Sequence, residues 1–207
     1  MVDTKPLFAF ASEYELRNVV GDCQNIDAQA LGVGILEFAT NLNRAILQRK
    51  ERGEISSVIL LGICGAYRQS GLNMGDVVCV ESEIVGDLGA ENRDGSFLPW
   101  PKIASEPVKV YQSADMGIAP AWLCRLKHVR GLSVNCCTGT ERTAQFRYAQ
   151  YGSHVESMEG AACFAICDTF SIPAFEVRAV SNYVGDRDKS KWDVETALRN
   201  LRQVICI

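Results

Sequence analysis

The fold is organised around the stretch His154–Ile166, which reads His-Val-Glu-Ser-Met-Glu-Gly-Ala-Ala-Cys-Phe-Ala-Ile. Two carboxylates, Glu156 and Glu159, stand directly before a run of small and apolar residues. Small side chains let a helix approach neighbouring backbone closely, so the run from Gly160 predicts a central helix. A carboxylate in the first turn of such a helix is favoured by the helix dipole and is costly to bury without partners. The glutamates are therefore either solvated at a helix N-terminus, or one of them accepts hydrogen bonds from a bound polyol.

Composition narrows the class of protein. The chain has 207 residues, 47% of them hydrophobic, which is enough for one well-buried domain over residues 1–207 and too few to argue for two. The net charge is −4 and no long cluster of Lys or Arg occurs, so nucleic acid is not an expected partner. The apolar run Leu7–Ala11 is too short for a signal peptide, and no later run approaches the length of a membrane span. We therefore expect a soluble, cytoplasmic protein with no membrane partner.

The nine cysteines raise the question of a metal site or a disulfide framework. Their number is odd, no Cys-x-x-Cys pair occurs, and only two histidines are present. A zinc site needs Cys and His ligands at suitable spacing, which these residues do not supply. Several of the cysteines lie inside apolar runs, where a reduced thiol behaves as a small hydrophobe. We expect reduced structural thiols, no metal and no cofactor.

Short apolar runs alternate with segments of helical periodicity along the chain. The predicted strands cover 5–12, 28–34, 57–62, 76–82, 132–137 and 173–181. The predicted helices cover 35–52, a segment from about 141, the central helix from 160 and a last helix capped by Ser190 and Asp193. A long loop over 86–107 is either functional or a surface excursion. The alternation predicts an α/β fold, a single three-layer domain whose mainly parallel mixed sheet is flanked by helices.

Polar residues collect after the ends of the predicted strands. They are Glu13 and Glu15 in an acidic turn, the glycine-rich turn 62–65, residues 138–143, Glu156 and Glu159, and Ser181 and Asn182. In a parallel sheet, ligands bind at the carboxyl ends of the strands, so one shared pocket is the economical hypothesis. The glycine-rich turn matches neither a Walker pattern nor Gly-x-Gly-x-x-Gly, so it is not predicted to bind a nucleotide phosphate.

Four segments carry a family resemblance. They are Val-Glu-x-Met-Glu-Gly-Ala-Ala at 155–162, Val-Arg-Ala-Val-Ser at 177–181, Gly-x-x-Gly-Ala at 62–66 and the acidic turn after the first strand. Together they resemble the nucleoside phosphorylase/nucleosidase superfamily over nearly the whole chain. Within it, the segment Ser181–Asp188 and the pair Lys191-Trp192 are most similar to the futalosine hydrolase family. The resemblance implies a nucleoside phosphorylase-like fold and a homodimer. It also implies release of hypoxanthine from futalosine, a 5′-modified purine nucleoside of menaquinone biosynthesis.

The resemblance also implies residue roles for purine N-glycosidic bond cleavage. The ribose must be held in a negatively biased site, the departing purine must be neutralised, and a nucleophile must wait on the opposite sugar face. Glu159 is expected to accept hydrogen bonds from the ribose hydroxyls, with Met158 against the sugar, and Glu15 to activate water with help from Arg178. Asn182 is expected to read the base. The other expected substrate contacts are Glu156, Ile63, Cys64, Gly65, Arg142, Thr143 and Ser181.

Several of these roles have alternatives. Glu13 replaces Glu15 if the register of the acidic turn slips. Arg178 shares a strand face with Glu176 and alternatively forms a structural ion pair with it. Asn182 alternatively only caps the end of its strand.

The acidic turn favours water over phosphate as the acceptor. Phosphorylases of this superfamily have a Gly-Asp-Pro-x-Arg-like segment where this chain has Ala-Ser-Glu-Tyr-Glu at 11–15. Carboxylates there would repel a phosphate anion and would activate a water. One departure is Ile63, which stands where methylthioadenosine nucleosidases have a serine that helps to hold the water, so the details of water positioning are open.

Two rival functions remain open at this level. One is release of adenine from methylthioadenosine, S-adenosylhomocysteine or aminodeoxyfutalosine, which Asn182 disfavours because the adenine-cleaving relatives place an aspartate at this position. The other is a non-catalytic nucleoside-binding module, which the presence of Glu15, Glu159 and Arg178 disfavours. In each case the expected partner is a small purine nucleoside.

Overall fold

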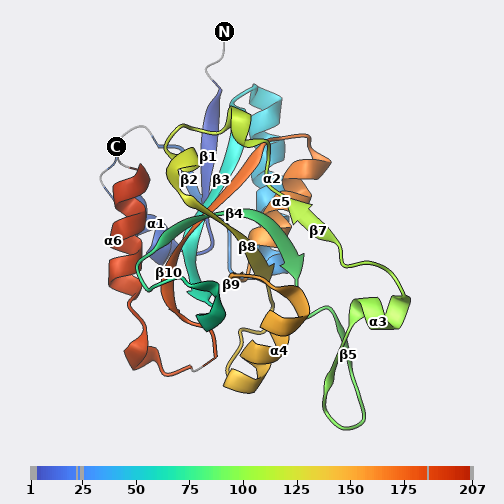
Figure 1. Ribbon diagram of the computed structural model, residues 1–207. Coiled ribbons are helices and arrows are strands. Elements are labelled where there is room, and N and C mark those ends of the chain that lie inside the picture. The colour runs from blue at the N-terminus through green and yellow to red at the C-terminus, as the bar shows by residue number, and fades with distance from the viewer. Residues whose placement is uncertain (1–3, 22, 24–25, 186, 206–207) are drawn as a thin grey trace.

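The computed structural model describes residues 4–21, 23, 26–185 and 187–205. Asp186, part of the segment that resembles futalosine hydrolase, lies outside the described residues. Within the described residues the chain forms an α/β fold in which helices flank a mixed sheet (Figure 1), as the sequence predicts.

The main sheet has eight strands and a partly closed topology. The order is β10-β4-β8-β9-β3-β1-β2, with β7 beside β4, and β10 also pairs with β3. The β10–β4, β3–β9 and β4–β7 pairings are antiparallel and the others are parallel. The β10–β3 pairing closes β3, β9, β8, β4 and β10 into a ring. The strands are β1 (Lys5–Phe10), β2 (Ala28–Ala30), β3 (Ile55–Ala66), β4 (Val77–Val85), β7 (Val110–Gln112), β8 (Lys127–Ser133), β9 (Val155–Ser157) and β10 (Ala174–Tyr183).

The central strand β3 is buried on both faces, which explains its continuous apolar sequence. Val58 and Leu60 belong to the core formed with α2 (Ile35–Arg52) and α5 (Gly160–Thr169). Ile59 and Leu61 belong to the core formed with α1 (Glu13–Val20) and α6 (Val194–Ile205). In Figure 1, α1 and α6 lie on one side of the sheet and α2 and α5 on the other. Alternate side chains of β3 therefore pack against the helices on opposite sides of the sheet.

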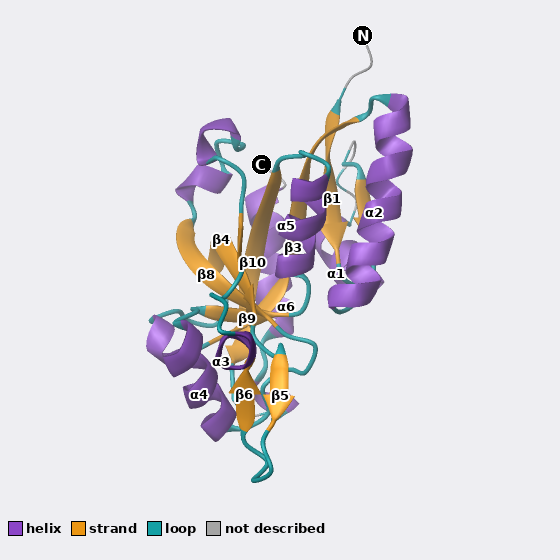
Figure 2. Ribbon diagram, turned by 90° about the vertical axis from the view of Figure 1, so that its right-hand side faces the viewer, coloured by secondary structure: helices purple, strands orange, loops and turns teal. Residues whose placement is uncertain are grey.

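The remaining elements extend one end of the molecule. They are the hairpin β5 (Gly89–Glu91) and β6 (Phe97–Pro99), α3 (Trp100–Ala104) and α4 (Glu141–Tyr151). Figure 2 shows them grouped at the lower end of the view. Short 3₁₀ turns occur at Arg68–Ser70, Met116–Ile118, Leu123–Arg125 and Lys189–Lys191. The predicted loop 86–107 thus contains a small sheet and a helix.

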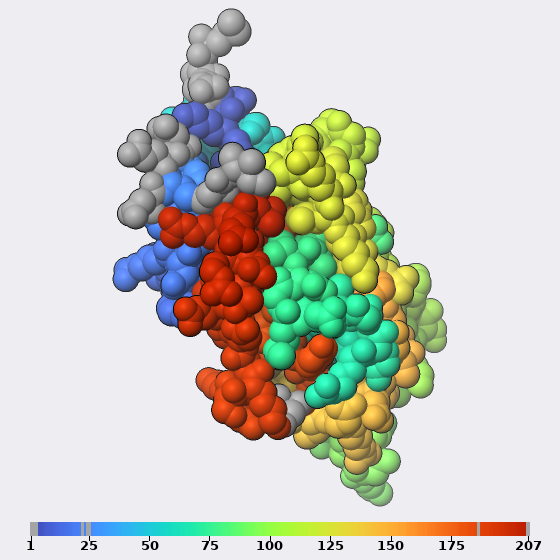
Figure 3. Space-filling view, turned by 60° about the vertical axis from the view of Figure 1, so that its left-hand side comes forward, coloured from blue at the N-terminus to red at the C-terminus, as the bar shows by residue number. Residues whose placement is uncertain are grey.

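The predicted helices are largely confirmed. Helix α2 spans the predicted 35–52 and ends at Gly53, whose left-handed backbone (φ 70°) suits glycine. Helix α5 is central and buried. Helix α6 buries the predicted apolar stripe. In Figure 3, α6 lies beside the segment that leads into β4, where the Asn200 side chain donates to Gly75 O at 2.8 Å.

Three local predictions are wrong. The acidic turn after β1 is the first turn of α1, because Ser12 and Glu15 form a reciprocal capping box. The glycine-rich turn 62–65 is the carboxyl-terminal part of β3, which continues to Ala66 along β10. Helix α6 is capped by Asp193, which accepts from Thr196 N at 3.0 Å, and Ser190 belongs to the preceding 3₁₀ turn.

Other boundaries shift without changing the layers. Strand β8 covers Lys127–Ser133 where 132–137 was predicted, and β2 covers only the first part of 28–34. None of the described helices is long and apolar enough to cross a membrane.

The described cysteines are free thiols except Cys23, which forms a disulfide. The expectation that all the cysteines are reduced is therefore wrong at that position. Among the described residues, no cluster of His, Cys, Asp and Glu suited to a metal ion occurs.

Candidate active site

A cavity of about 280 Å³ opens at the carboxyl ends of β1, β3 and β10, where parallel sheets typically bind ligands. Strand β9 and the residues after it complete one wall, because β9 pairs with the end of β3. The lining residues are Ala11, Ser12, Tyr14, Glu15, Val33, Ile63, Cys64, Gly65, Cys137, Thr138, Glu156, Ser157, Met158, Glu159, Arg178, Ser181, Asn182, Val184, Arg187 and Trp192.

Glu159 is held at the wall of the cavity by two donors. Gly34 N donates to its Oε1 at 3.0 Å, and Arg178 Nη2 donates to its Oε2 at 3.2 Å. A carboxylate oxygen can accept two hydrogen bonds. Each oxygen of Glu159 therefore keeps one acceptor position for a ligand, which suits a vicinal diol.

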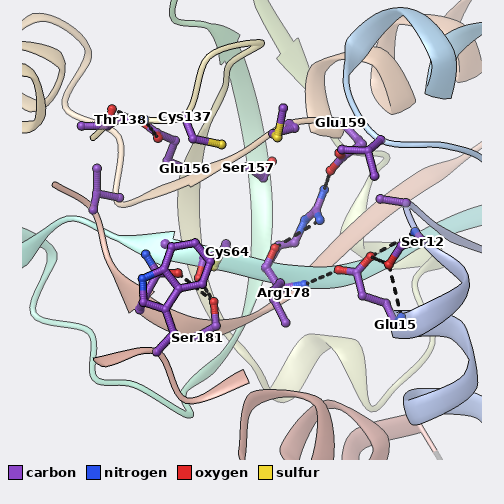
Figure 4. Close-up of a pocket in the computed structure, with 18 of the residues that line it drawn as sticks. Ser12, Glu15, Cys64, Cys137, Thr138, Glu156, Ser157, Glu159, Arg178 and Ser181 are labelled. Carbon is purple, nitrogen blue, oxygen red and sulfur yellow. Dashed lines mark hydrogen bonds and ion pairs between the residues drawn. The ribbon is translucent and has the colours of Figure 1, made fainter. Parts of the chain in front are cut away.

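Glu15 lines the cavity beside Arg178 (Figure 4). Its Oε2 accepts from both the backbone N and the hydroxyl of Ser12, at 3.1 and 2.8 Å. Its Oε1 accepts from Ile63 N at 3.0 Å and keeps one acceptor position. The main chain of Ile63, and not its side chain, thus orients Glu15.

Gly62 allows this arrangement. A Cβ at Gly62 would lie 2.7 Å from Arg178 Nη1 and 2.8 Å from Glu15 Oε1, so any larger residue would displace one of them. Glu15 Oε1 and Arg178 Nη1 both lie against Gly62, so the free acceptor position of Glu15 is next to the guanidinium of Arg178. A water at that position would contact a base and a fixed positive charge together.

Arg178 is the buried cation of the site, with 1% of its surface exposed. Its Nε donates to Glu176 Oε1 at 2.7 Å and its Nη1 donates to Ile63 O at 3.4 Å. Burial by itself lowers the pKa of Arg178, but the carboxylates of Glu176 and Glu159 outweigh it and raise the pKa above its ordinary value. The ion pair with Glu176 and the contact with the cavity therefore coexist in one side chain.

Glu156 lies on the β9 side of the cavity and accepts four hydrogen bonds from the protein, three of them at Oε2. Its Oε1 accepts from Thr138 N at 2.8 Å. Its Oε2 accepts from Thr138 Oγ1 at 2.7 Å, Tyr67 Oη at 2.8 Å and Arg147 Nη1 at 3.1 Å. Burial and the charge of Glu156 raise the pKa of Tyr67, which therefore stays a neutral donor. Glu156 ties β9 to α4 and to the residues before it.

The far end of the cavity carries hydrogen-bond donors. Asn182 Oδ1 accepts from Ser181 Oγ at 2.8 Å and its Nδ2 donates to Tyr183 O at 3.0 Å, which leaves one amide hydrogen for a ligand. The indole Nε1 of Trp192 is buried and lacks a partner among the described residues. Arg187 stacks over the Trp192 ring at 5.8 Å. A ligand atom that accepts hydrogen bonds at this end would satisfy the free amide hydrogen of Asn182.

Two thiols line the cavity, and neither is an activated nucleophile. Burial raises the pKa of Cys64 to about 12. Burial, together with the charge of Glu156, also raises the pKa of Cys137. A thiol must ionise to attack, so covalent catalysis by cysteine is disfavoured here.

The structure brings together ten of the twelve predicted site residues, which are Glu15, Ile63, Cys64, Gly65, Glu156, Met158, Glu159, Arg178, Ser181 and Asn182. Arg142 and Thr143 do not line the cavity, because they lie in the first turn of α4, where Thr143 bonds to the cap residue Thr140. Glu13 also points away, with 66% of its side chain exposed and an ion pair to Arg17.

Some lining residues were missed by the sequence reasoning. Ser12 precedes Glu15 by three residues, a capping-box spacing that predicts its contact with Glu15. Arg187 and Trp192 lie in the segment that carried the family resemblance, which was a usable signal. Cys137 ends the predicted strand 132–137 and Thr138 follows it, and their position in the cavity depends on the tertiary fold.

The amino-acid sequence is similar to those of known enzymes. Residues 37–206 match the family model of the phosphorylase superfamily. The futalosine hydrolase of Thermus thermophilus is 29% identical over 185 residues, covering 84% of this chain and 80% of that protein. The futalosine hydrolase of Streptomyces coelicolor is 32% identical over 149 residues, covering 72% of this chain and 63% of that protein.

A solved structure shares the fold. It is a futalosine hydrolase mutant from Helicobacter pylori, with a TM-score of 0.79 and 15% identity. The match covers 98% of this chain and 96% of that one. At this identity the likeness bears on the fold, whereas the family rests on the sequence matches.

Proposed function

The chain belongs to the phosphorylase superfamily, and from this premise we propose that it hydrolyses the N-glycosidic bond of a 5′-modified purine nucleoside, with futalosine as the preferred substrate. The observation that carries the proposal is the Glu15–Arg178–Glu159 cluster, in which both carboxylates keep free acceptor positions toward one cavity. The sequence relatives named above are futalosine hydrolases, which supports the choice of substrate. The products would be hypoxanthine and dehypoxanthine futalosine, an intermediate of menaquinone biosynthesis.

The sugar is held by Glu159 in this proposal. Its two free acceptor positions, one on each oxygen, take the two ribose hydroxyls, and Met158 covers the sugar. Positive charge develops on the ribose as the base departs, so a nearby carboxylate stabilises the transition state more than the ground state. Arg178 keeps Glu159 in place and limits the negative charge of the cavity.

Water is the proposed nucleophile. Glu15 Oε1 accepts from Ile63 N and has one remaining position, where it takes a proton from water as the water attacks the sugar. A phosphate anion would need several donors at this position. The described groups around it are the carboxylates of Glu15 and Glu159 with the single guanidinium of Arg178, already bonded to Glu176 and Glu159.

The base is proposed to be a 6-oxopurine. Such a base presents acceptors at O6 and N7, and the free donors at this end are the second amide hydrogen of Asn182 and the Trp192 indole. A 6-aminopurine would place its amino donor against these donors. An unmatched buried contact of this kind costs about 1–3 kcal/mol.

The 5′ substituent and the assembly complete the proposal. A second hollow of about 340 Å³ shares Val33 and Met158 with the cavity and offers room for a 5′ group. Val33 and Leu36 beside it are 52% and 80% exposed, which supports a homodimer that covers this rim. We further propose that residues 1–207 act as one nucleosidase domain in the cytoplasm.

The test is release of free base from a panel of nucleosides. Purified protein would be incubated with futalosine, inosine, methylthioadenosine and S-adenosylhomocysteine, each with and without phosphate. We expect hypoxanthine from futalosine at a rate that phosphate does not change. Ribose 1-phosphate as a product would refute hydrolysis, preferred release of adenine would refute the 6-oxopurine assignment, and binding without turnover would leave only a nucleoside-binding module.

A further inference from the structure

A second pair of carboxylates lies behind the cavity. Glu83 on β4 and Glu176 on β10 are both 0% exposed. A Cβ on Gly160 would collide with Glu83 Oε1 and with Glu176 Oε2, so these two oxygens meet at one point beside the start of α5. Neither oxygen has a hydrogen-bond donor among the described residues. Two ionised carboxylates in contact would repel each other, and neither would have a hydrogen to donate.

The other oxygen of each carboxylate has a defined partner. Ser133 Oγ accepts from Ala161 N at 2.8 Å, so its hydroxyl hydrogen is free to donate to Glu83 Oε2 at 2.9 Å. Glu176 Oε1 accepts from Arg178 Nε at 2.7 Å. Glu83 therefore has a neutral partner, whereas Glu176 has a cation.

This asymmetry decides where a single proton would reside. A carboxylate paired with a guanidinium is stabilised in its ionised form, and a buried carboxylate without a counter-ion is stabilised in its neutral form. We propose that Glu83 is a protonated positioning residue whose Oε1–H donates to Glu176 Oε2. The shared proton gives both orphan oxygens a partner at once.

The titration of the pair supports this assignment. Burial and the neighbouring charge of Glu176 hold the pKa of Glu83 well above its ordinary value. Burial also raises the pKa of Glu176, against the opposing effects of Arg178 and of the hydrogen bond with Glu83. The titratable and charged groups around the pair are Arg178 on β10, Glu159 at the start of α5, Cys64 on β3, Cys79 on β4 and Cys163 on α5.

The direction of the pKa shift sets a pH window. Because the folded pKa of Glu83 is raised, the stabilisation from its proton is complete below the ordinary glutamate pKa. It is lost as the pH rises through the raised value. We therefore expect this stabilisation to be lost at alkaline pH, where Glu83 is deprotonated.

The protonation state of Glu83 affects the cavity through three successive contacts. Glu83 fixes Glu176, Glu176 fixes Arg178 through Nε, and Arg178 holds Glu159 through Nη2. An ionised Glu83 would add a second negative charge beside Glu176 and draw the guanidinium away from Glu159. The charge assignment stands without the proposed activity, and only its kinetic consequence rests on that activity.

The first test detects the proton directly in the native protein. Infrared spectra of protein labelled with ¹³C at glutamate carboxyls should show a carboxylic-acid C=O band at pH 7–8. The band should disappear in Glu83→Gln and persist in Glu81→Gln, a matched control two residues away on β4 whose side chain is 49% exposed. A native protein without such a band overturns the proposal whether or not either variant folds, and so does a band that survives in folded Glu83→Gln.

The second test separates the hydrogen-bond donor from mere packing. The amide of Glu83→Gln can donate to Glu176 at every pH, so kcat/KM for futalosine should stay within about threefold of native. The fall in kcat/KM at alkaline pH that is assigned to deprotonation of Glu83 should vanish in this variant. Glu83→Met has similar size and no donor, so kcat/KM should fall about tenfold or more. Equal losses in folded Gln and Met variants, or an unchanged alkaline limb in Glu83→Gln, would refute a positioning role. Absence of any nucleosidase activity would refute the proposed function, and the infrared result would still decide the proton.

Discussion

Glu156 and Glu159 are the same residue type, three positions apart, and the fold uses them in opposite ways. Glu156 accepts four hydrogen bonds, from Thr138, Tyr67 and Arg147. Glu159 accepts two, from Gly34 and Arg178, and Figure 4 shows it on the Arg178 side of the site, whereas Glu156 lies beside Thr138. A carboxylate that accepts four hydrogen bonds from three other residues mainly holds the structure together. One with positions to spare can bind a ligand.

The same distinction sorts the other polar residues of the cavity. Glu15 and Asn182 each keep one hydrogen-bonding position, and Trp192 keeps its only one. We therefore expect substitutions at residues with a free position toward the cavity to change activity, and the substitution of Glu156 to change mainly stability.

The largest loss is expected for Glu15→Gln. An amide cannot take a proton from water, so kcat should fall by about 10²–10⁴-fold, the usual contribution of a general base. Base release measured at saturating futalosine checks this. Glu13→Gln is the matched control, because Glu13 lies two residues earlier in the same first turn of α1 and its side chain is 66% exposed. A damaged Glu13→Gln beside an active Glu15→Gln would reverse the assignment of the base.

Glu159→Gln should come next. The amide replaces one acceptor oxygen by a donor and removes the negative charge near the developing sugar cation. We expect kcat/KM to fall by at least about 10²-fold, with a higher KM because the ground-state hydroxyls lose a partner. Steady-state kinetics check both values, and thermal unfolding confirms that the variant folds. Near-native rates would mean that another residue anchors the sugar.

A smaller and more specific change is expected for Asn182→Asp. An aspartate removes the amide donor and adds an acceptor, which favours the amino group of adenine over the oxygen of hypoxanthine. The ratio of kcat/KM for futalosine to that for its amino analogue should fall by roughly ten- to a hundredfold. An unchanged ratio would assign base recognition to other residues, with Trp192 the next to test.

The smallest effect on activity is expected for Glu156→Gln, which tests the other side of the comparison. The folded variant should keep kcat/KM within about fivefold, while the free energy of unfolding falls by about 1–3 kcal/mol because buried donors lose a charged acceptor. Denaturant unfolding measures the second value. A loss of activity as large as that of Glu159→Gln in a fully folded variant would end the distinction between the two glutamates.

Much of this protein follows from local sequence. The apolar run of β3, the 3.6-residue periodicity of α2 and the small residues of α5 are strong local signals, and each predicted element is present. The alternation of these elements implies a parallel sheet, and a parallel sheet implies that polar residues after the strands gather at one edge. Ten of the predicted site residues meet there for this reason.

Other features were decided only by tertiary structure. The motif that contains Glu156 and Glu159 does not reveal which of the two accepts more hydrogen bonds from the protein, because the donors include Tyr67, Arg147 and Gly34, which do not belong to the motif. Arg142 and Thr143 follow a strand end like the other predicted residues, yet the start of α4 carries them away from the cavity.

The pairing of Glu83 with Glu176 shows the limit of sequence most clearly. Each residue occurs in an ordinary apolar strand, with nothing local to indicate a partner. They meet because β10 pairs with β4 and both strands lie under the start of α5, where Gly160 leaves room for two carboxyl oxygens. Local sequence determines which elements form, since their signals are short-range. The occupancy of each hydrogen-bonding group depends on contacts between distant segments, and only the folded chain creates those contacts.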